Sequence, residues 1–231
     1  MRILLTETNW TSLGLARDLQ EEGFLVTRAG DVEEALHMAE FARNDAVLID
    51  TDLPDMDFEE VLATITVRVP GLPVFVIGGA DRGLSTAEVL DLGADDIFGE
   101  PLDPVLIGQR IRAVVRRAQG LSSPQIELGG LTVNLASAVL SYGGRTIGLT
   151  RYEYEIIEML ALRPGQIIAR DDIMTQLYAL EDEPSEKIID VYLSRIRGKL
   201  RAAGHAADIL RSARNRGVSL WPCQREMRKA A

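Results

Sequence analysis

The sequence has few of the residues that build disulfides and metal centres. Its 231 residues include one cysteine, Cys223, and two histidines, His37 and His205. One cysteine cannot form an internal disulfide, and two histidines far apart in the chain supply no metal-ligand cluster. This composition fits the reducing cytoplasm, where we expect the protein to work.

Long apolar segments are missing too. No window approaches the roughly 18 consecutive apolar residues that a membrane helix needs. Residues 1–7 combine too short an apolar run with too early an acidic residue for a signal peptide. Hydrophobic residues still make up 46% of the chain, which is enough to bury a core, and the length allows one large domain or two ordinary ones. We therefore expect a globular protein with no membrane partner.

Positive charge is scarce at the start of the chain and concentrated near its end. Residues 1–118 hold 10 Lys and Arg against 22 Asp and Glu, a net charge of −12, and residues 119–231 hold 15 against 13, or +2. Residues 187–229 hold 11 against 3, or +8. This asymmetry predicts a polyanionic partner for the C-terminal end. A basic surface that only meets solvent is the alternative.

Short apolar runs alternate with helical patterns through the N-terminal half. The expected pairs of strand and helix span residues 2–5 and 12–22, 25–27 and 32–43, 46–49 and 58–67, 74–77 and 86–92, and 96–98 and 104–117. Five such units predict an α/β domain over residues 1–118, with a doubly wound, five-stranded parallel sheet and helices on both faces. In such sheets the functional groups gather at the carboxyl ends of the strands.

Acidic residues follow two of these strands. Glu7 comes after the first strand, and Asp50 and Asp52 come after the third. No glycine-rich turn follows the first strand, so a dinucleotide site is not expected. The side chains of Glu7 and Asp50 and the backbone carbonyl of Asp52 can hold a hard divalent cation such as Mg²⁺. The alternative is that these acids cap the helices that follow.

Residues 48–56, the Gly-Ala-Asp-Asp stretch at 93–96 and Pro101 resemble a bacterial response-regulator receiver, which implies a flavodoxin-like or CheY-like topology. By this resemblance Asp50 matches the phosphoryl-accepting aspartate. Four positions depart from the family pattern: Thr8 stands for an acid, Gly78 for Ser or Thr, Ile97 for an aromatic residue and Glu100 for Lys. Residues 1–186 contain no lysine, so no neighbouring lysine can take the missing role.

These departures remove parts that phosphoryl transfer uses. Exchanging a lysine for Glu100 turns an attraction on the phosphoryl oxygens into a repulsion of roughly a few kcal/mol at an effective dielectric near 20. Without a carboxylate at Thr8, any Mg²⁺ binding should be weak. We therefore expect a degenerate receiver that is not switched by aspartyl phosphate. Conventional phosphorylation of Asp50 by a histidine kinase is the alternative.

Receivers of this family pair through their last helices and last strand. Asp95, Asp96, Arg110 and Arg117 match positions of the ion pairs between two copies, while Leu106 replaces an acid of a third pair. The resemblance thus implies a homodimer formed through the receiver domains. The alternative is that these charges only meet solvent, because surface ion pairs are each worth about 0–1 kcal/mol.

A Gly/Ser/Pro segment, residues 119–125, marks a linker. Short strands at residues 126–128, 131–135, 138–142 and 146–149 then predict a small antiparallel sheet, with a hairpin turn at Gly143-Gly144. Three helices follow: one capped by Thr150 with Glu153, a second at residues 170–180 and a third at residues 186–203. We place this α+β domain at residues 126–223, followed by a basic tail, residues 224–231.

The third of these helices carries a basic face. Its apolar positions predict a core side, and its remaining positions are left for solvent or a partner. The apolar set is Ile188, Ile189, Val191, Leu193, Ile196 and Leu200, and the polar set is Lys187, Ser194, Arg195, Arg197, Lys199 and Arg201. Residues 209–221 then read as a hairpin with two arginines near its tip. A basic helix suits the major groove of DNA, and an arginine-tipped hairpin suits the minor groove.

Residues 147–154 and 188–197 closely resemble the winged-helix effector domain of OmpR/PhoB-family response regulators. Glu183-Pro184, leading into Ile188-Ile189-Asp190-Val191, looks especially like the CtrA branch of this family. The DNA-facing residues that the resemblance implies are Lys187, Tyr192, Ser194 and Arg195 on the helix, Arg197 on a phosphate, and Ser212, Arg214 and Arg216 on the wing. An acidic loop with Glu181, Asp182 and Glu183 matches the place where this family can meet RNA polymerase. Val218 replaces the usual wing tyrosine and Asn215 the usual wing glycine.

Taken together, these features predict a sequence-specific, DNA-binding transcription regulator rather than an enzyme. We expect it to bind double-stranded DNA as a dimer, without phosphorylation and without a required cofactor. A conventional phosphorelay response regulator is the first alternative. The second is an interaction module that binds a kinase or a related regulator without binding DNA.

Overall fold

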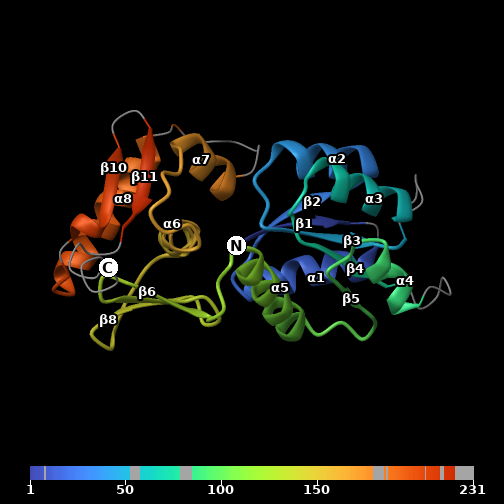
Figure 1. The fold of residues 1–231 in the computed structure, drawn as a ribbon, viewed down its shortest axis with the longest axis horizontal. Helices are drawn as coiled ribbons and strands as arrows, with labels where there is room; N and C mark the ends of the chain where they lie inside the picture. Colours follow the sequence, from blue (N-terminus) through green and yellow to red (C-terminus); the bar gives the residue numbers. More distant parts are fainter. Residues whose placement is uncertain are drawn as a thin grey trace. The chain divides into compact units, whose positions relative to one another are not determined.

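The computed structural model describes residues 1–7, 9–52, 58–78, 85–178, 185, 187–205, 207–213 and 216–221, with the backbone alone at Trp10 and Ala207. The chain divides into two compact units, Met1–Ala118 and Gln119–Ala231 (Figure 1). No helix within the described ranges is long and apolar enough to cross a membrane.

The N-terminal unit is built on one parallel sheet. Its strands are β1 (Arg2–Thr6), β2 (Leu25–Ala29), β3 (Ala46–Asp50), β4 (Val74–Ile77) and β5 (Asp96–Phe98), in the order β2-β1-β3-β4-β5. Every residue of β1, β3 and β4 is buried, as expected for strands covered on both faces. The prediction of a doubly wound, five-stranded parallel sheet is confirmed.

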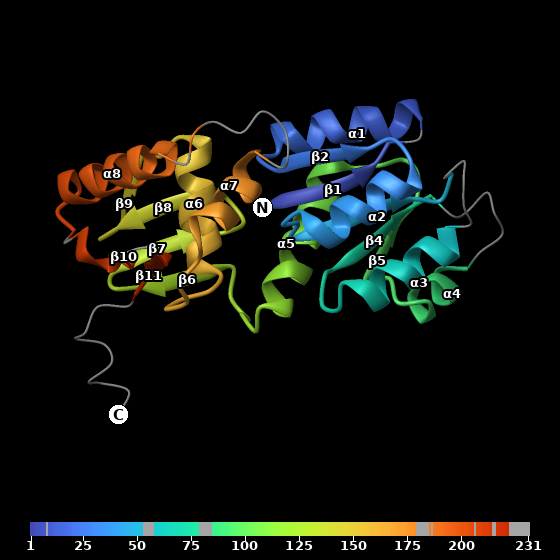
Figure 2. The same ribbon diagram turned by 90° about the horizontal axis from the view of Figure 1, so that it is seen from above.

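Helices cover both faces of this sheet. The helices α1 (Trp10–Glu21) and α5 (Pro104–Ala118) pack together on one face, and α2 (Val32–Phe41) and α3 (Phe58–Arg68) lie side by side on the other (Figures 1 and 2). The short α4 (Thr86–Asp91) buries Val89 in the same core cluster as α2 and α3. The strand order reverses at β1, which pairs with both β2 and β3, so the carboxyl ends of these three strands meet at one edge.

The first helix begins earlier than the sequence pattern predicted. We expected a start at Ser12, but α1 begins at Trp10 because Asn9 caps it. The Asn9 side-chain oxygen accepts the backbone N–H of Ser12 at 3.0 Å, and the Ser12 hydroxyl accepts the backbone N–H of Asn9 at 3.1 Å. This reciprocal capping box satisfies two N–H groups that a helix start leaves open, and it fixes the orientation of the Asn9 amide.

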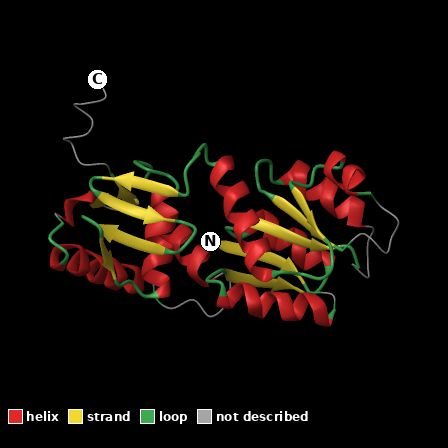
Figure 3. Ribbon diagram, turned by 90° about the horizontal axis from the view of Figure 1, so that it is seen from below, coloured by secondary structure: helices red, strands yellow, loops and turns green. Residues whose placement is uncertain are grey.

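The C-terminal unit starts with a four-stranded antiparallel sheet (yellow in Figure 3). Its strands are β6 (Gln125–Leu128), β7 (Leu131–Asn134), β8 (Val139–Tyr142) and β9 (Arg145–Ile147). Gly143 and Gly144 join β8 to β9 with φ values of +54° and +77°. A two-residue hairpin turn of this kind requires positive φ at both central positions, which is why two glycines stand there.

Three helices and a second hairpin complete this unit. They are α6 (Arg151–Ala161), α7 (Arg170–Tyr178), α8 (Lys187–Ala202), the 3₁₀ turn η2 (Ala207–Ile209), β10 (Leu210–Ala213) and β11 (Gly217–Leu220). Strands β10 and β11 form the wing, with Ser212 opposite Val218. Val218 also exchanges two backbone hydrogen bonds of 2.8 Å with Ile168. The winged-helix prediction for the C-terminal half is confirmed.

Candidate DNA-binding surface and acidic site

Helix α8 is anchored by one apolar stripe. Ile189, Leu193, Ile196 and Leu200 are all 0% exposed, and their spacing keeps them on one side of an α-helix. The opposite side therefore faces outward. Four residues of the predicted basic face are exposed there: Lys187, Ser194, Arg195 and Arg201.

One residue of the predicted core side is in fact outside the core. Val191 is 40% exposed, because a residue two positions after Ile189 points about 200° away from it on a helix of 3.6 residues per turn. Ile188 is only half-buried. Val191 instead lies between Lys187 and Arg195, each four residues away and thus on the same face. Helix α8 presents a row of cation, apolar side chain and cation.

Arg197 ties the wing to α8. The Arg197 guanidinium donates to the Leu210 carbonyl oxygen at 3.1 Å and to the Ser212 hydroxyl at 2.8 Å. Burial, with the nearby Arg201, lowers the pKa of Arg197 below that of a free guanidinium. Two residues predicted to face DNA, Arg197 and Ser212, are therefore brought together. Arg216 is exposed just before the wing's second strand.

Tyr192 belongs to a cluster of three tyrosines from three helices. Its hydroxyl lies 3.0 Å from the hydroxyl of Tyr178 on α7, and its ring lies 6.0 Å from the ring of Tyr152 on α6. Burial, together with the contact from Tyr192, raises the pKa of Tyr178. The sequence pattern did not predict the contacts of Tyr192 with Tyr152 and Tyr178, because it cannot show contacts between separate helices.

A nearly buried ion pair joins α8 to α6. The Lys199 ammonium lies 2.6 Å from the Glu153 carboxylate, which is 1% exposed. The same carboxylate accepts the backbone N–H of Thr150 at 2.8 Å. Burial alone would raise the pKa of Glu153, but the hydrogen bonds from Lys199 and Thr150 outweigh it and hold this pKa below its usual value. Lys199, which we had left for solvent or a partner, thus has a structural partner within the chain.

In the receiver-like unit, both oxygens of the Asp50 carboxylate accept hydrogen bonds. The side-chain amide of Asn9 donates to Oδ2 at 3.1 Å, and the backbone N–H of Asp52 donates to Oδ1 at 3.0 Å. The backbone N–H of Asp50 donates to the Thr6 hydroxyl at 2.7 Å. Asp50 is 4% exposed, so its carboxylate lies almost wholly within the fold.

Glu7 has its own cationic partner. The guanidinium of Arg28, near the end of β2, lies 3.1 Å from the Glu7 carboxylate. Arg28 pairs in register with Leu5 of β1, which brings its side chain to the end of β1 where Glu7 stands. In the described part of the chain, no three His, Cys, Asp or Glu side chains form a group suited to a metal ion.

The presence of glycine at position 78 has a steric explanation. It has a φ of +92°, and a Cβ atom at this position would lie 2.5 Å from the Thr51 hydroxyl oxygen. Thr51 is 3% exposed, so its side chain occupies the place where a residue larger than glycine would begin. Ile97 is half-buried, and Glu100 is exposed.

The residues predicted for dimer contacts have partners within their own chain. Asp96 and Arg110 form an ion pair of 3.0 Å, Asp95 accepts the backbone N–H of Val74 at 2.9 Å, and Arg117 donates to the Ala113 carbonyl at 3.1 Å. Three large apolar side chains are exposed on α4 and α5: Leu90 at 41%, Val105 at 51% and Leu106 at 49%.

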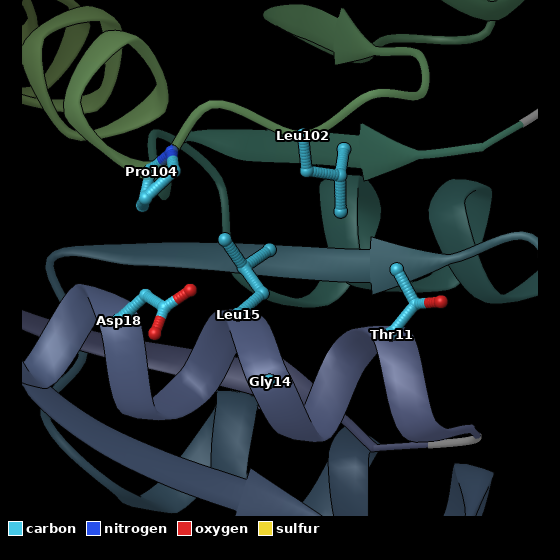
Figure 4. A pocket seen from close by; sticks show the side chains of 6 residues that line it. All are labelled: Thr11, Gly14, Leu15, Asp18, Leu102 and Pro104. Carbon is cyan, nitrogen blue, oxygen red and sulfur yellow. The ribbon is translucent and has the colours of Figure 1, made fainter.

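A small pocket of about 240 Å³ lies between α1 and the segment that leads into α5. Figure 4 shows Thr11, Leu15 and Asp18 on α1 facing Leu102 and Pro104. Asp18 is the one charged residue among the described side chains of this lining, and it is paired with Arg17 at 3.2 Å. Those side chains form no acid–base or nucleophilic pair. Five of the predicted site residues lie outside the described residues: Thr8, Glu181, Asp182, Glu183 and Arg214.

A receiver fold followed by a winged helix with a cationic outer face defines a two-domain DNA-binding regulator. Comparison with known proteins gives the same assignment. Residues 5–112 match the response regulator receiver domain, and residues 144–220 match the C-terminal domain of transcriptional regulatory proteins.

Relatives match along the whole chain. The chain is 33% identical over 221 residues to the cell cycle transcriptional regulator CtrA of Caulobacter vibrioides, covering 95% of this chain and 96% of that protein. It is 32% identical over 232 residues to the cell cycle response regulator CtrA of Brucella anthropi, covering 100% of each. It is also similar to the solved structure of DrrB, an OmpR/PhoB homologue of Thermotoga maritima, with 20% identity, 95% and 98% coverage and a TM-score of 0.43.

The chain belongs to the OmpR/PhoB family of response regulators. It is a DNA-binding transcription regulator.

Proposed function

We propose that this regulator binds its operators as a dimer whose activity does not depend on phosphorylation of Asp50. The observation that carries the proposal is that the Thr51 hydroxyl fills the space next to Gly78. A side chain at Gly78 would begin 2.5 Å from the Thr51 hydroxyl, so the site has no room for the Ser or Thr with which the family follows a phosphoryl group. Glu100 in place of lysine adds repulsion where a cation is needed.

On DNA, we propose that the exposed row of α8 reads bases in the major groove while the wing meets the backbone and the minor groove. Arg195 and Lys187 supply donors for guanine and phosphate, and the exposed methyl groups of Val191 suit the methyl group of thymine. Ser194 and the Tyr192 hydroxyl are polar neighbours of this row. Ser212, Arg214 and Arg216 are the proposed wing contacts, with Arg197 fixing the wing to the helix.

Selection of duplexes from a random library tests these roles. Arg195→Ala should relax the preference at one or two base positions and cost about 1–3 kcal/mol. Val191→Ala should weaken a preference for thymine. The control is Arg145→Ala, because Arg145 is an exposed arginine of β9 outside the proposed base-reading row. If the variants select the same sequence as the wild type with unchanged affinity, the base-reading roles are wrong.

The proposed dimer uses the α4–β5–α5 face. Support comes from exposed Leu90, Val105 and Leu106, beside the charged side chains of Asp96 and Arg110. Leu106→Asp should shift the mass measured by light scattering toward the monomer. Val67→Asp on α3 is the control, because Val67 is also apolar and 79% exposed but lies outside this face. Equal effects of the two variants would contradict the proposed interface.

Phosphorylation itself is tested with acetyl phosphate and Mg²⁺. We expect no stoichiometric mass increase and no change in DNA affinity. If the mass increases and Asp50→Asn abolishes the increase, the result supports a conventional phosphorelay function and refutes the proposed phosphorylation-independent function.

We further propose that the acidic segment with Glu181, Asp182 and Glu183 contacts RNA polymerase, as in the family it resembles. Exchanging the three acids for their amides should leave operator affinity unchanged and alter transcription from a promoter that carries the selected operator. Unaltered transcription would remove this role.

A further inference from the structure

We infer that Arg28 is the resident cation of the acidic site and takes the electrostatic role that a divalent metal has in other receivers. The inference rests on the proposed phosphorylation-independent function and gives it a cause within the site. It assigns a role to two residues, Arg28 and Asn9, that the receiver pattern did not single out.

The first step concerns charge. Glu7, Asp50 and Asp52 lie at the carboxyl ends of β1 and β3, which are neighbours in the sheet, so their negative charges need compensation. The Arg28 guanidinium, 3.1 Å from the Glu7 carboxylate, supplies a positive charge from β2, the neighbour on the other side of β1. A guanidinium is charged at every physiological pH, so this compensation is permanent.

The second step concerns the oxygen atoms. A metal ion needs carboxylate lone pairs that point toward it. One Asp50 oxygen faces the Asn9 amide at 3.1 Å, and the other faces the Asp52 N–H at 3.0 Å. Asn9 cannot simply turn away, because its oxygen caps α1 by accepting the Ser12 N–H. Each Asp50 oxygen thus already accepts one hydrogen bond, and the Glu7 carboxylate is paired with Arg28. Mg²⁺ would have to compete with a partner at both carboxylates, so the residues present fit it poorly.

The third step concerns the missing acid. Position 8 is Thr where receivers carry a second carboxylate, so the site holds one negative charge fewer, and Arg28 offsets one of the three that remain through its ion pair with Glu7. The substitution at Thr8 and the cation at Arg28 act in the same direction.

Direct metal binding to the full-length protein tests this inference. Mn²⁺ serves as the probe, and electron paramagnetic resonance measures the concentration of free Mn²⁺ in each sample. The wild type should show no saturable binding below millimolar Mn²⁺, and Arg28→Gln should bind at least 10-fold more tightly. Arg28→Lys should behave like the wild type because it keeps the charge. Arg68→Gln is the matched control, since Arg68 has a similar exposure of 56% and pairs with Glu40 on the surface.

A second readout protects the test against a folding defect. Mg²⁺ should raise the thermal midpoint of Arg28→Gln, because a ligand that binds the folded state stabilises it, and it should leave the wild type and Arg68→Gln unchanged. The inference is overturned if the wild type binds Mn²⁺ as tightly as Arg28→Gln, if Arg28→Gln gains no affinity, or if Arg68→Gln gains as much. These outcomes are independent of the phosphodonor assay, whose positive result would refute the proposed function instead.

Discussion

Replacing Gly217 by alanine should displace the wing. A Cβ atom at this position would lie 1.9 Å from the carbonyl oxygen of Ile168, and the residue has a φ of +135°. The clash is with backbone and cannot be relieved by a side-chain rotation. We therefore expect the bridge between Ile168 and Val218 to break, with its two hydrogen bonds of 2.8 Å.

The magnitude follows from these two effects. Backbone strain at a sparsely populated φ costs about 1–3 kcal/mol, and each lost hydrogen bond costs about 0.5–1.5 kcal/mol, which together give about 2–6 kcal/mol. Gly144→Ala is the matched control, because Gly144 has a φ of +77° but a Cβ atom there would meet no described atom within 4 Å. It should cost only about 1–2 kcal/mol of strain.

Urea unfolding measures the difference. The chain has two tryptophans, and in a Trp10→Phe background the fluorescence of Trp221, which follows the wing, reports on the C-terminal unit alone. Under conditions where both variants are folded, Gly217→Ala should bind a selected operator at least 10-fold more weakly, and Gly144→Ala should bind it normally. If the two variants have equal stability and equal affinity, the steric reasoning is wrong.

Three further predictions concern the ion pair and the remodelled receiver site. Lys199→Gln should lower the unfolding free energy by about 2–3 kcal/mol, which is less than for a fully buried pair because Lys199 is 35% exposed. Arg201 is exposed, so Arg201→Gln should change the unfolding free energy by less than about 0.5 kcal/mol. Equal effects of the two variants would contradict the role of the pair. The pKa of Glu153 is lowered in the folded state, so its stabilisation is present above the usual value of 4.5 and is lost as pH falls through the folded-state pKa; the urea midpoint of Glu153→Gln should therefore fall less on acidification than that of the wild type, and parallel curves would refute this. Gly78→Ser should destabilise the N-terminal unit, since its Cβ would meet the Thr51 hydroxyl, and adding Thr51→Ala should recover part of the loss; no recovery would show that this contact is not the cause.

Local sequence patterns predict much of the fold. The buried strands β1, β3 and β4 are short continuous apolar runs, and the glycine pair between β8 and β9 marks its turn directly. The capping box of Thr150 and Glu153 also depends on residues only three apart. Such features depend on neighbours in the chain, so the sequence is sufficient to predict them.

The candidate site was predicted less completely. The substitutions at Thr8, Gly78, Ile97 and Glu100 are visible without any structure, and so is the basic character of α8. Val191 was wrongly assigned to the core side, because its apolar character was weighed above its helical position about 200° from the buried Ile189.

What the sequence by itself determined is the chemistry of each position: an acidic first domain without lysine, and a basic helix and hairpin at the other end. What only the tertiary structure decided is which of those groups neutralise one another. The pairing of β2 with β1 brings Arg28 to Glu7, and the packing of α8 directs Lys199 to Glu153 and Arg197 to the wing. These partners lie 13 to 46 residues apart in the chain, so their contacts arise from strand register and helix packing, which no local pattern encodes.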